Sequence, residues 1–69
     1  MFTVKCFTTR NTLYECQVEV GVEAITTAHL LAEIYGLTTN CRCNVYKPGE
    51  ATHFYSVSGQ MDVTERRFT

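Results

Sequence analysis

Two segments near the start of the chain alternate apolar and polar residues, which is the pattern of a half-buried β-strand. They cover residues 2–8 (FTVKCFT) and 13–20 (LYECQVEV), and the polar residues 9–12 separate them. This arrangement predicts a β-hairpin. With Asn11 at the centre of the turn, one mostly apolar face pairs Phe2 with Val20, Val4 with Val18, Cys6 with Cys16, and Thr8 with Tyr14. The other, mostly polar face pairs Thr3 with Glu19, Lys5 with Gln17, and Phe7 with Glu15.

An amphipathic helix is predicted over about residues 22–35. Gly21 interrupts the preceding strand, and Glu23 places a negative charge in the first turn, where it suits the helix dipole. At about 100° per residue, the apolar stripe has Ala24, Ala28, Leu31 and Tyr35 at its centre and Ile25, Ala32, Ile34 and Thr27 on its flanks. The opposite side carries Thr26, His29 and Glu33, with Leu30 at the margin. The small alanines let the helix approach the sheet closely, and Gly36 is predicted as the C-terminal cap.

A second hairpin is predicted over about residues 39–58. It turns at Lys47-Pro48-Gly49-Glu50, where Pro and Gly suit the two central positions of a type II turn. Two registers are open. A two-residue loop pairs Lys47 with Glu50 and puts Cys41, Cys43, Val45 and Phe54 on one face, with Arg42, Asn44, Tyr46, His53 and Tyr55 on the other. A loop one residue longer moves His53 and Tyr55 to the cysteine face.

The last ten residues, 60–69 (QMDVTERRFT), contain one short alternation. We expect a fifth edge strand around Met61 and Val63, followed by a flexible tail over about residues 64–69. Residues 1–69 then form one domain, because a chain of this length builds one core. The expected fold class is α+β, of ββαββ type, in which an antiparallel sheet of four or five strands carries one amphipathic helix on one face.

Composition and charge place the chain among ordinary globular domains. Apolar residues make up 45% and charged residues 19%, and six Lys and Arg face seven Asp and Glu. No concentrated positive charge points to nucleic acid. No apolar run approaches the roughly 18 residues of a membrane span, and the N-terminus lacks the features of a signal peptide. We therefore expect a cytoplasmic protein without membrane contact.

Cysteine is the residue type with the most chemistry in this sequence. Because no export signal is recognised, we expect reduced thiols rather than a disulfide scaffold. The one set that could be argued as a metal site joins Cys41 and Cys43 with Cys6, Cys16, His29 and His53. Its spacing is poor, because Cys41 and Cys43 are one residue apart, whereas paired zinc ligands are usually separated by two to four residues. We therefore expect buried thiols that pack as small apolar side chains, and no metal site or cofactor. Cys6 and Cys16, if opposite one another, could form a cross-strand disulfide under oxidation.

Enzymatic function is not expected. No cysteine or histidine lies in a local sequence typical of a nucleophile and its base, so no catalytic residue is assigned. A phosphate-binding loop is also missing from the sequence, because the four glycines are scattered at Gly21, Gly36, Gly49 and Gly59. The paired Glu15 and Glu19 fit a solvated strand face better than an acid–base pair.

A binding function has better support. One helix is about 10–12 Å across, whereas four strands about 4.8 Å apart span nearly twice that width, so part of the apolar sheet face needs another cover. That cover could be the C-terminal segment, a second copy or a partner protein. The candidate partner-binding residues are Arg42, Tyr46, His53 and Tyr55. Single-stranded nucleic acid and a structural homodimer are the alternatives, the first weakened by the net charge of −1.

The run Gln17-Val18-Glu19-Val20-Gly21, a short helix with Ala24 and Ala28 one turn apart, and the following hairpin resemble compact ββαββ modules among small phage-encoded proteins. Some of these are anti-CRISPR proteins and other inhibitors of host machinery. The resemblance covers residues 2–58 at the level of architecture. It implies a non-enzymatic inhibitor that occludes a host protein in the host cytoplasm. The nearly neutral charge argues against DNA mimicry.

Overall fold

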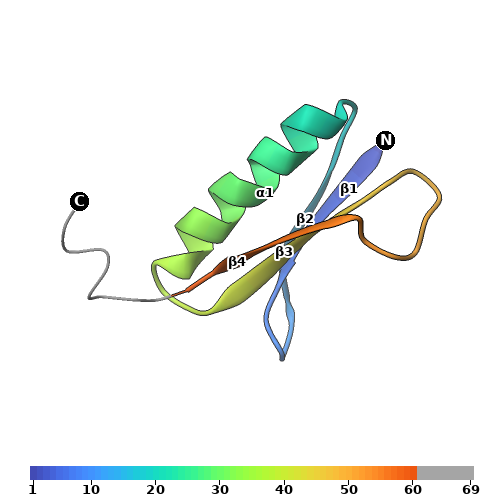
Figure 1. The fold of residues 1–69 in the computed structure, drawn as a ribbon. Helices are drawn as coiled ribbons and strands as arrows, with labels where there is room; N and C mark the ends of the chain where they lie inside the picture. Colours follow the sequence, from blue (N-terminus) through green and yellow to red (C-terminus); the bar gives the residue numbers. More distant parts are fainter. Residues whose placement is uncertain (61–69) are drawn as a thin grey trace.

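The computed structural model describes residues 1–60, which form one antiparallel sheet and one helix (Figure 1). In chain order the elements are β1 (Phe2–Phe7), β2 (Thr12–Val18), α1 (Gly21–Gly36), β3 (Cys41–Tyr46) and β4 (Tyr55–Gly59). The strand order is β2-β1-β3-β4. This confirms the α+β, ββαββ class with four strands. The expected fifth strand at Met61 and Val63 and the expected tail at 64–69 lie outside the described residues.

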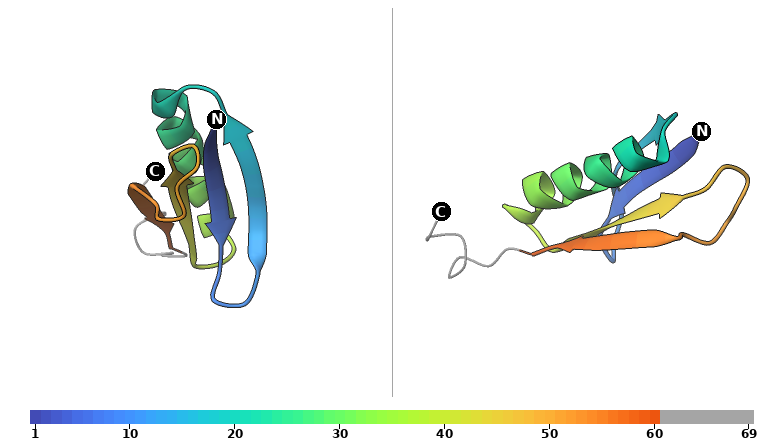
Figure 2. Two further views of the ribbon diagram at one scale, coloured as in Figure 1. Left: turned by 90° about the vertical axis from the view of Figure 1, so that its right-hand side faces the viewer. Right: turned by 45° about the horizontal axis from the view of Figure 1, so that its top comes forward.

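The sheet has two faces, and within residues 1–60 a single helix covers one of them. Figure 2 shows α1 lying along one side of the sheet, and no helix formed by residues 1–60 lies on the other side. We call these the helix face and the open face. The helix packs mainly over β1, β3 and β4 and touches β2 only marginally. As the width argument predicts, Tyr14 on the uncovered edge strand is 46% exposed although it lies opposite the buried Cys6.

The register of the first hairpin differs from the prediction by two residues. Phe2 pairs with Val18, Val4 with Cys16, and Cys6 with Tyr14, so Cys6 does not face Cys16. The faces survive because the shift is even. The turn is responsible: the Thr8 backbone N–H donates to the Asn11 carbonyl at 2.8 Å, which centres the turn before Asn11. A β-bulge next to Phe7, which pairs with Thr12, absorbs the odd residue, Leu13.

The second hairpin contains the predicted turn within a longer loop. The Glu50 N–H donates to the Lys47 carbonyl at 3.1 Å, and Gly49 has φ of 78°, as a type II turn requires. The strand resumes only at Tyr55, after a loop over residues 47–54. Both predicted loop lengths are therefore wrong. The observed register pairs Cys41 with Gly59, Cys43 with Val57, and Val45 with Tyr55.

The helix contacts the sheet through its smallest residues. Its buried positions are Ala24, Ala28, Ala32 and Gly36, so the predicted bounds are nearly right but Gly36 is a packing residue inside the helix rather than its cap. Gly59 on β4 shows how close the approach is: a Cβ added there would lie 2.1 Å from the Ala32 carbonyl oxygen. The rest of the core is equally small, since its largest fully buried side chains are Val4, Val45, Cys6 and Cys43.

Within residues 1–60, the helix is neither long nor apolar enough to cross a membrane.

Candidate functional site

The four predicted binding residues do not form one surface. Arg42 and Tyr46 lie on the open face of β3, and His53 reaches the same face from the loop before β4. Tyr55 lies on the helix face, because it pairs with the buried Val45. Of the two registers left open, the one that puts all four residues on one face is therefore wrong. Tyr55 lies on the cysteine face, as the longer of the two predicted loops requires. His53 belongs to no strand.

Tyr55 has a structural role. Its hydroxyl shares a hydrogen bond with His29 Nε2 on α1, and the two ring centroids are 5.6 Å apart. The prediction that His29 lies on the solvent side of the helix is confirmed, because the residue is exposed. Its ring lies on the side of α1 that borders β4. This contact ties α1 to the edge strand β4 and places Tyr55 apart from the other three candidate binding residues.

Tyr46 and His53 are organised by Asn44, which is only 6% exposed. The Asn44 amide nitrogen donates to the Tyr46 hydroxyl at 3.3 Å and lies 3.3 Å from His53 Nδ1. The Ser56 hydroxyl donates to the Asn44 amide oxygen at 2.8 Å. We call these residues the Asn44 cluster. Because the buried amide uses its donors and its acceptor, it fixes two aromatic rings on the open face.

The open face is hollowed next to the first turn. A depression of about 360 Å³ is lined by side chains that include Lys5, Arg10, Phe7 and Tyr46. Arg42 lies opposite Phe7 across β1 and β3. Basic and aromatic side chains therefore meet on the two central strands of the sheet.

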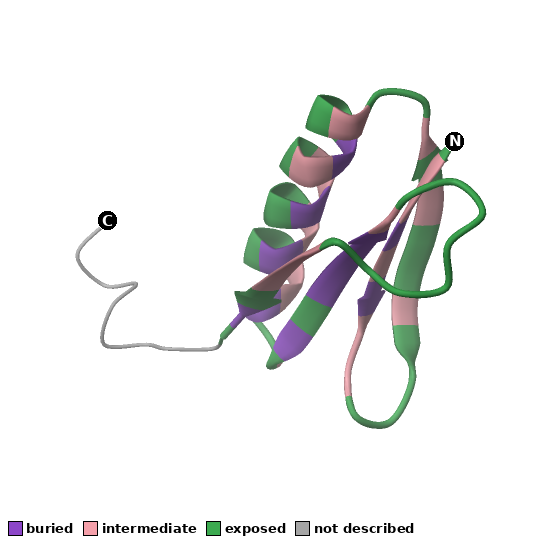
Figure 3. Cartoon of the chain, turned by 45° about the vertical axis from the view of Figure 1, so that its right-hand side comes forward, coloured by how far each residue is buried: buried purple, intermediate pink, exposed green. Residues whose placement is uncertain are grey.

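The outward side of the helix has the opposite character. Leu30, Ile34 and Leu37 are each more than half exposed and are spaced i, i+4 and i+7. Leu30 lies roughly 160° around the helix from the buried Ala28. We call these three residues the outer helix stripe, and Figure 3 shows the exposed colour on the side of α1 turned away from the sheet. Ile34 was predicted on the flank of the core stripe, and that assignment is wrong.

Acidic residues border this stripe. The helix carries Glu23 and Glu33 and has no Lys or Arg. The basic residues of the described chain, Lys5, Arg10, Arg42 and Lys47, all lie in the strands and loops of the sheet layer. The molecule therefore presents an acidic, apolar helix side and a more basic, aromatic sheet side.

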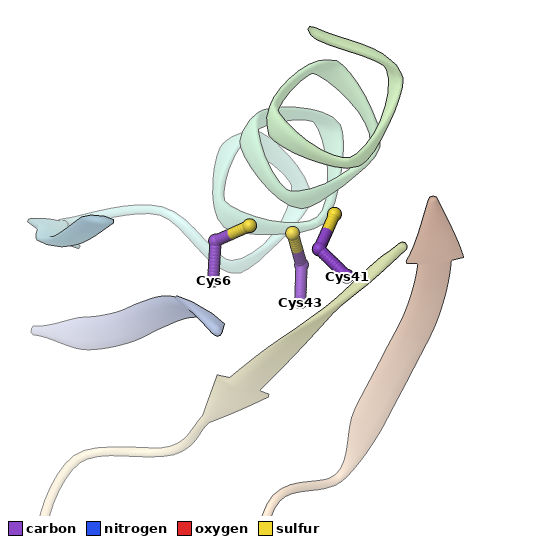
Figure 4. A group of neighbouring side chains, drawn as sticks. All are labelled: Cys6, Cys41 and Cys43. Carbon is purple, nitrogen blue, oxygen red and sulfur yellow. The ribbon is translucent and has the colours of Figure 1, made fainter. Parts of the chain in front are cut away.

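A third cluster lies beneath the helix, where β1 and β3 bring Cys6, Cys41 and Cys43 together (Figure 4). Their sulfur atoms all lie within 4.8 Å of one another. Cys6 pairs directly with Cys43, and Cys41 follows on the same side of β3. Among the described residues, this is the one group of three or more Cys, His, Asp or Glu side chains close enough to share an ion. We call it the cysteine triad.

Burial keeps these thiols protonated. The pKa of Cys6 is raised from 9.0 to about 12, first by desolvation, then by its hydrogen bond with Cys43, and then by the repulsion that two ionised sulfurs would exert on one another. Desolvation also raises the pKa of Cys41 and of Cys43. A protonated thiol is a poor nucleophile, so the triad is not poised for nucleophilic catalysis.

The sequence groups Cys6, Cys41 and Cys43 only within a larger candidate set and does not show that these three meet, and it does not single out the outer helix stripe. The one-residue separation of Cys41 and Cys43 is not typical of metal ligands. The third member, Cys6, comes from a strand distant in sequence. The i, i+4, i+7 spacing of Leu30, Ile34 and Leu37 was visible, but it competed with the alanine stripe for the core. The expectation that no metal binds stays a prediction.

A comparison with protein-family models, curated proteins and solved structures found no match to this chain.

Proposed function

We propose that the protein is a non-enzymatic protein-binding module, a phage-type inhibitor that occludes a partner protein of its host, and that the outer helix stripe is its contact surface. The observation that carries the proposal is the distribution of side-chain size around α1. Alanine and glycine face the core, while Leu30, Ile34 and Leu37 face outward. Exposed apolar side chains gathered on one face are typical of an interaction surface.

The charges around the stripe indicate what kind of partner fits. Glu33 lies directly beside Ile34, and the helix has no basic residue to balance it. In a two-fold pairing of two helices across the stripe, Glu33 would approach the Glu33 of the second copy, which is unfavourable. Nucleic acid would meet the same negative charge. The complementary partner is a protein with an apolar groove for a helix and Lys or Arg at its rim.

The candidate nucleophiles favour a non-enzymatic role. Burial holds the triad thiols in the protonated form. The two histidines are engaged with Tyr55 and with the Asn44 cluster rather than with a cysteine. We assign these contacts to the stability of the fold, and we assign binding to the outer helix stripe.

The test uses a photo-crosslinking amino acid at position 34 and, as a matched control, at the exposed position 17 on the uncovered edge strand β2. In cells of the host, position 34 is expected to give one saturable cross-linked protein and position 17 to give none. In the position-34 protein, adding Leu30→Ser with Leu37→Ser should abolish the product, whereas adding Tyr46→Ser should preserve it. Equal cross-linking from both positions, or a cross-linked second copy, would overturn the proposal.

A second candidate function rests on the open face. The depression lined by Lys5, Arg10, Phe7 and Tyr46 resembles the mixture of cationic and aromatic side chains on which single-strand binders stack bases. Titration with labelled oligonucleotides at low and moderate salt tests it. Binding at low salt that Tyr46→Ser weakens supports this function, and no binding at low salt excludes it.

A further inference from the structure

Three converging sulfur atoms in an apolar core form a ligand set that the proposed binding function does not use. Cys6 and Cys43 are fully buried, and Cys41 is 7% exposed. Figure 4 shows their side chains reaching from β1 and β3 into the space beneath α1. Since thiols from two strands meet there, the arrangement comes from the pairing of β1 with β3 rather than from a local sequence motif.

The distances between the three sulfurs are close to those between sulfurs that bind one ion. Three sulfurs bound to one ion at about 2.3 Å lie roughly 3.4 to 4.0 Å apart. The triad sulfurs are all within 4.8 Å of one another. Closing the site requires movements of about 1 Å at most, within the reach of side-chain rotation on fixed strands.

The surroundings select the charge of the bound ion. The core cluster around the triad consists of Val4, Val45 and the helix alanines, and none of its members carries a positive charge. A buried complex with net charge is costly in such a place. Three thiolates carry three negative charges, so a divalent ion leaves a buried net charge of −1, whereas a trivalent ion gives a neutral complex.

The triad has a route to solvent. Cys41 is part of the lining of a surface hollow of about 290 Å³, together with Phe7, Arg42, Ser58 and Gly59. Of the triad, Cys41 is therefore the residue that a small neutral molecule would meet first from this hollow.

We propose that Cys6, Cys41 and Cys43 form a three-sulfur site for a trivalent thiophilic element of the arsenic and antimony class, in preference to divalent zinc. Soft ions prefer thiolate ligands, and these two form three bonds to sulfur. Binding of arsenous acid is balanced: three S–H and three As–OH bonds break, three As–S bonds form, and three waters leave. No oxidant is needed, and arsenic remains trivalent.

The experiment uses the full chain, kept reduced and freed of metal, in the Cys16→Ala background, because that variant retains only the triad thiols. Sodium arsenite is titrated and followed by native mass spectrometry and by the arsenic–sulfur absorption band. We expect one arsenic per chain with loss of three hydrogens. X-ray absorption should show three sulfur neighbours.

Two comparisons decide the result. Adding Cys41→Ala should weaken arsenite binding at least about tenfold, because closure of the third bond is then lost. If that variant does not fold, the sulfur count in the parent protein decides alone: three sulfurs support the proposal, and two overturn it. Zinc sulfate binding as tightly as arsenite, or tight arsenite binding that survives Cys41→Ala, would also overturn it.

Discussion

Asn44 is the residue on which the order of the open face depends. Replacing it with alanine leaves the Ser56 hydroxyl and the Tyr46 hydroxyl without their buried partner. We expect Asn44→Ala to lower the free energy of unfolding by about 1–3 kcal/mol. Urea denaturation followed by circular dichroism measures this. Ser58→Ala, at an exposed position on the same face of β4, should change stability by less than about 0.5 kcal/mol. Equal effects would contradict the role assigned to Asn44.

Gly59 is constrained by space and not by backbone angle. Its added Cβ would collide with the Ala32 carbonyl and approach the Cys41 sulfur to 2.9 Å. Since neither backbone can yield without separating β4 from α1, Gly59→Ala should cost about 3 kcal/mol. Gly49→Ala meets no atom but requires φ of 78°, so it should cost about 1 kcal/mol. Thermal unfolding of both variants tests this order, and a Gly49 variant less stable than the Gly59 variant would contradict it.

The helix shows how burial and residue size can be uncoupled within one element. Leu30→Ser together with Ile34→Ser removes two large apolar side chains, yet we expect the unfolding free energy to change by less than about 1 kcal/mol, because both are exposed. Ala28→Leu adds volume at a fully buried position and should cost about 1–3 kcal/mol. Chemical denaturation distinguishes them. A large loss from the double serine variant would mean that the stripe supports the fold instead of a partner.

Local periodicity predicts elements well and contacts between elements poorly. The faces of β1 and β2 follow from their alternation, because the error of two residues in register leaves the side chains of residues 2–6 and 14–18 on their predicted faces. The start of β4 could not be predicted, since residues 50–54 contain neither alternation nor a strong turn signal. The cysteine triad could not be predicted from the sequence for a related reason. Cys6 meets Cys43 only through the pairing of β1 with β3, which is not encoded in any short segment.

Because the core of the molecule packs around neutral thiols, the stability of the fold decreases at alkaline pH. In the unfolded chain Cys6 ionises near its ordinary pKa of 9.0, whereas in the folded protein the pKa is about 12. Between these values the unfolded state binds fewer protons, so the contribution of Cys6 to stability is complete below pH 9 and is lost as the pH rises toward 12.

We therefore expect the free energy of unfolding to fall steadily above pH 9, by up to about 1.4 kcal/mol per pH unit for one thiol. The measurement is a series of urea titrations under reducing conditions from pH 7 to about 11. A Cys6→Ala variant starts lower at pH 7 and should show a shallower decline. Parallel curves for the variant and the parent protein would contradict the assignment to Cys6.

The strand order also bears on how the protein is made. The first hairpin and the helix leave the ribosome before β3, which is the inner neighbour of β1. Until β3 arrives, β1 exposes one unpaired backbone edge, and the helix alanines have only half of their sheet to pack against. The sheet closes at its centre rather than at its rim. A chain truncated after Gly36 would thus present an unpaired strand edge, and during synthesis the rate at which residues 37–46 emerge sets how long that edge stays open to another chain.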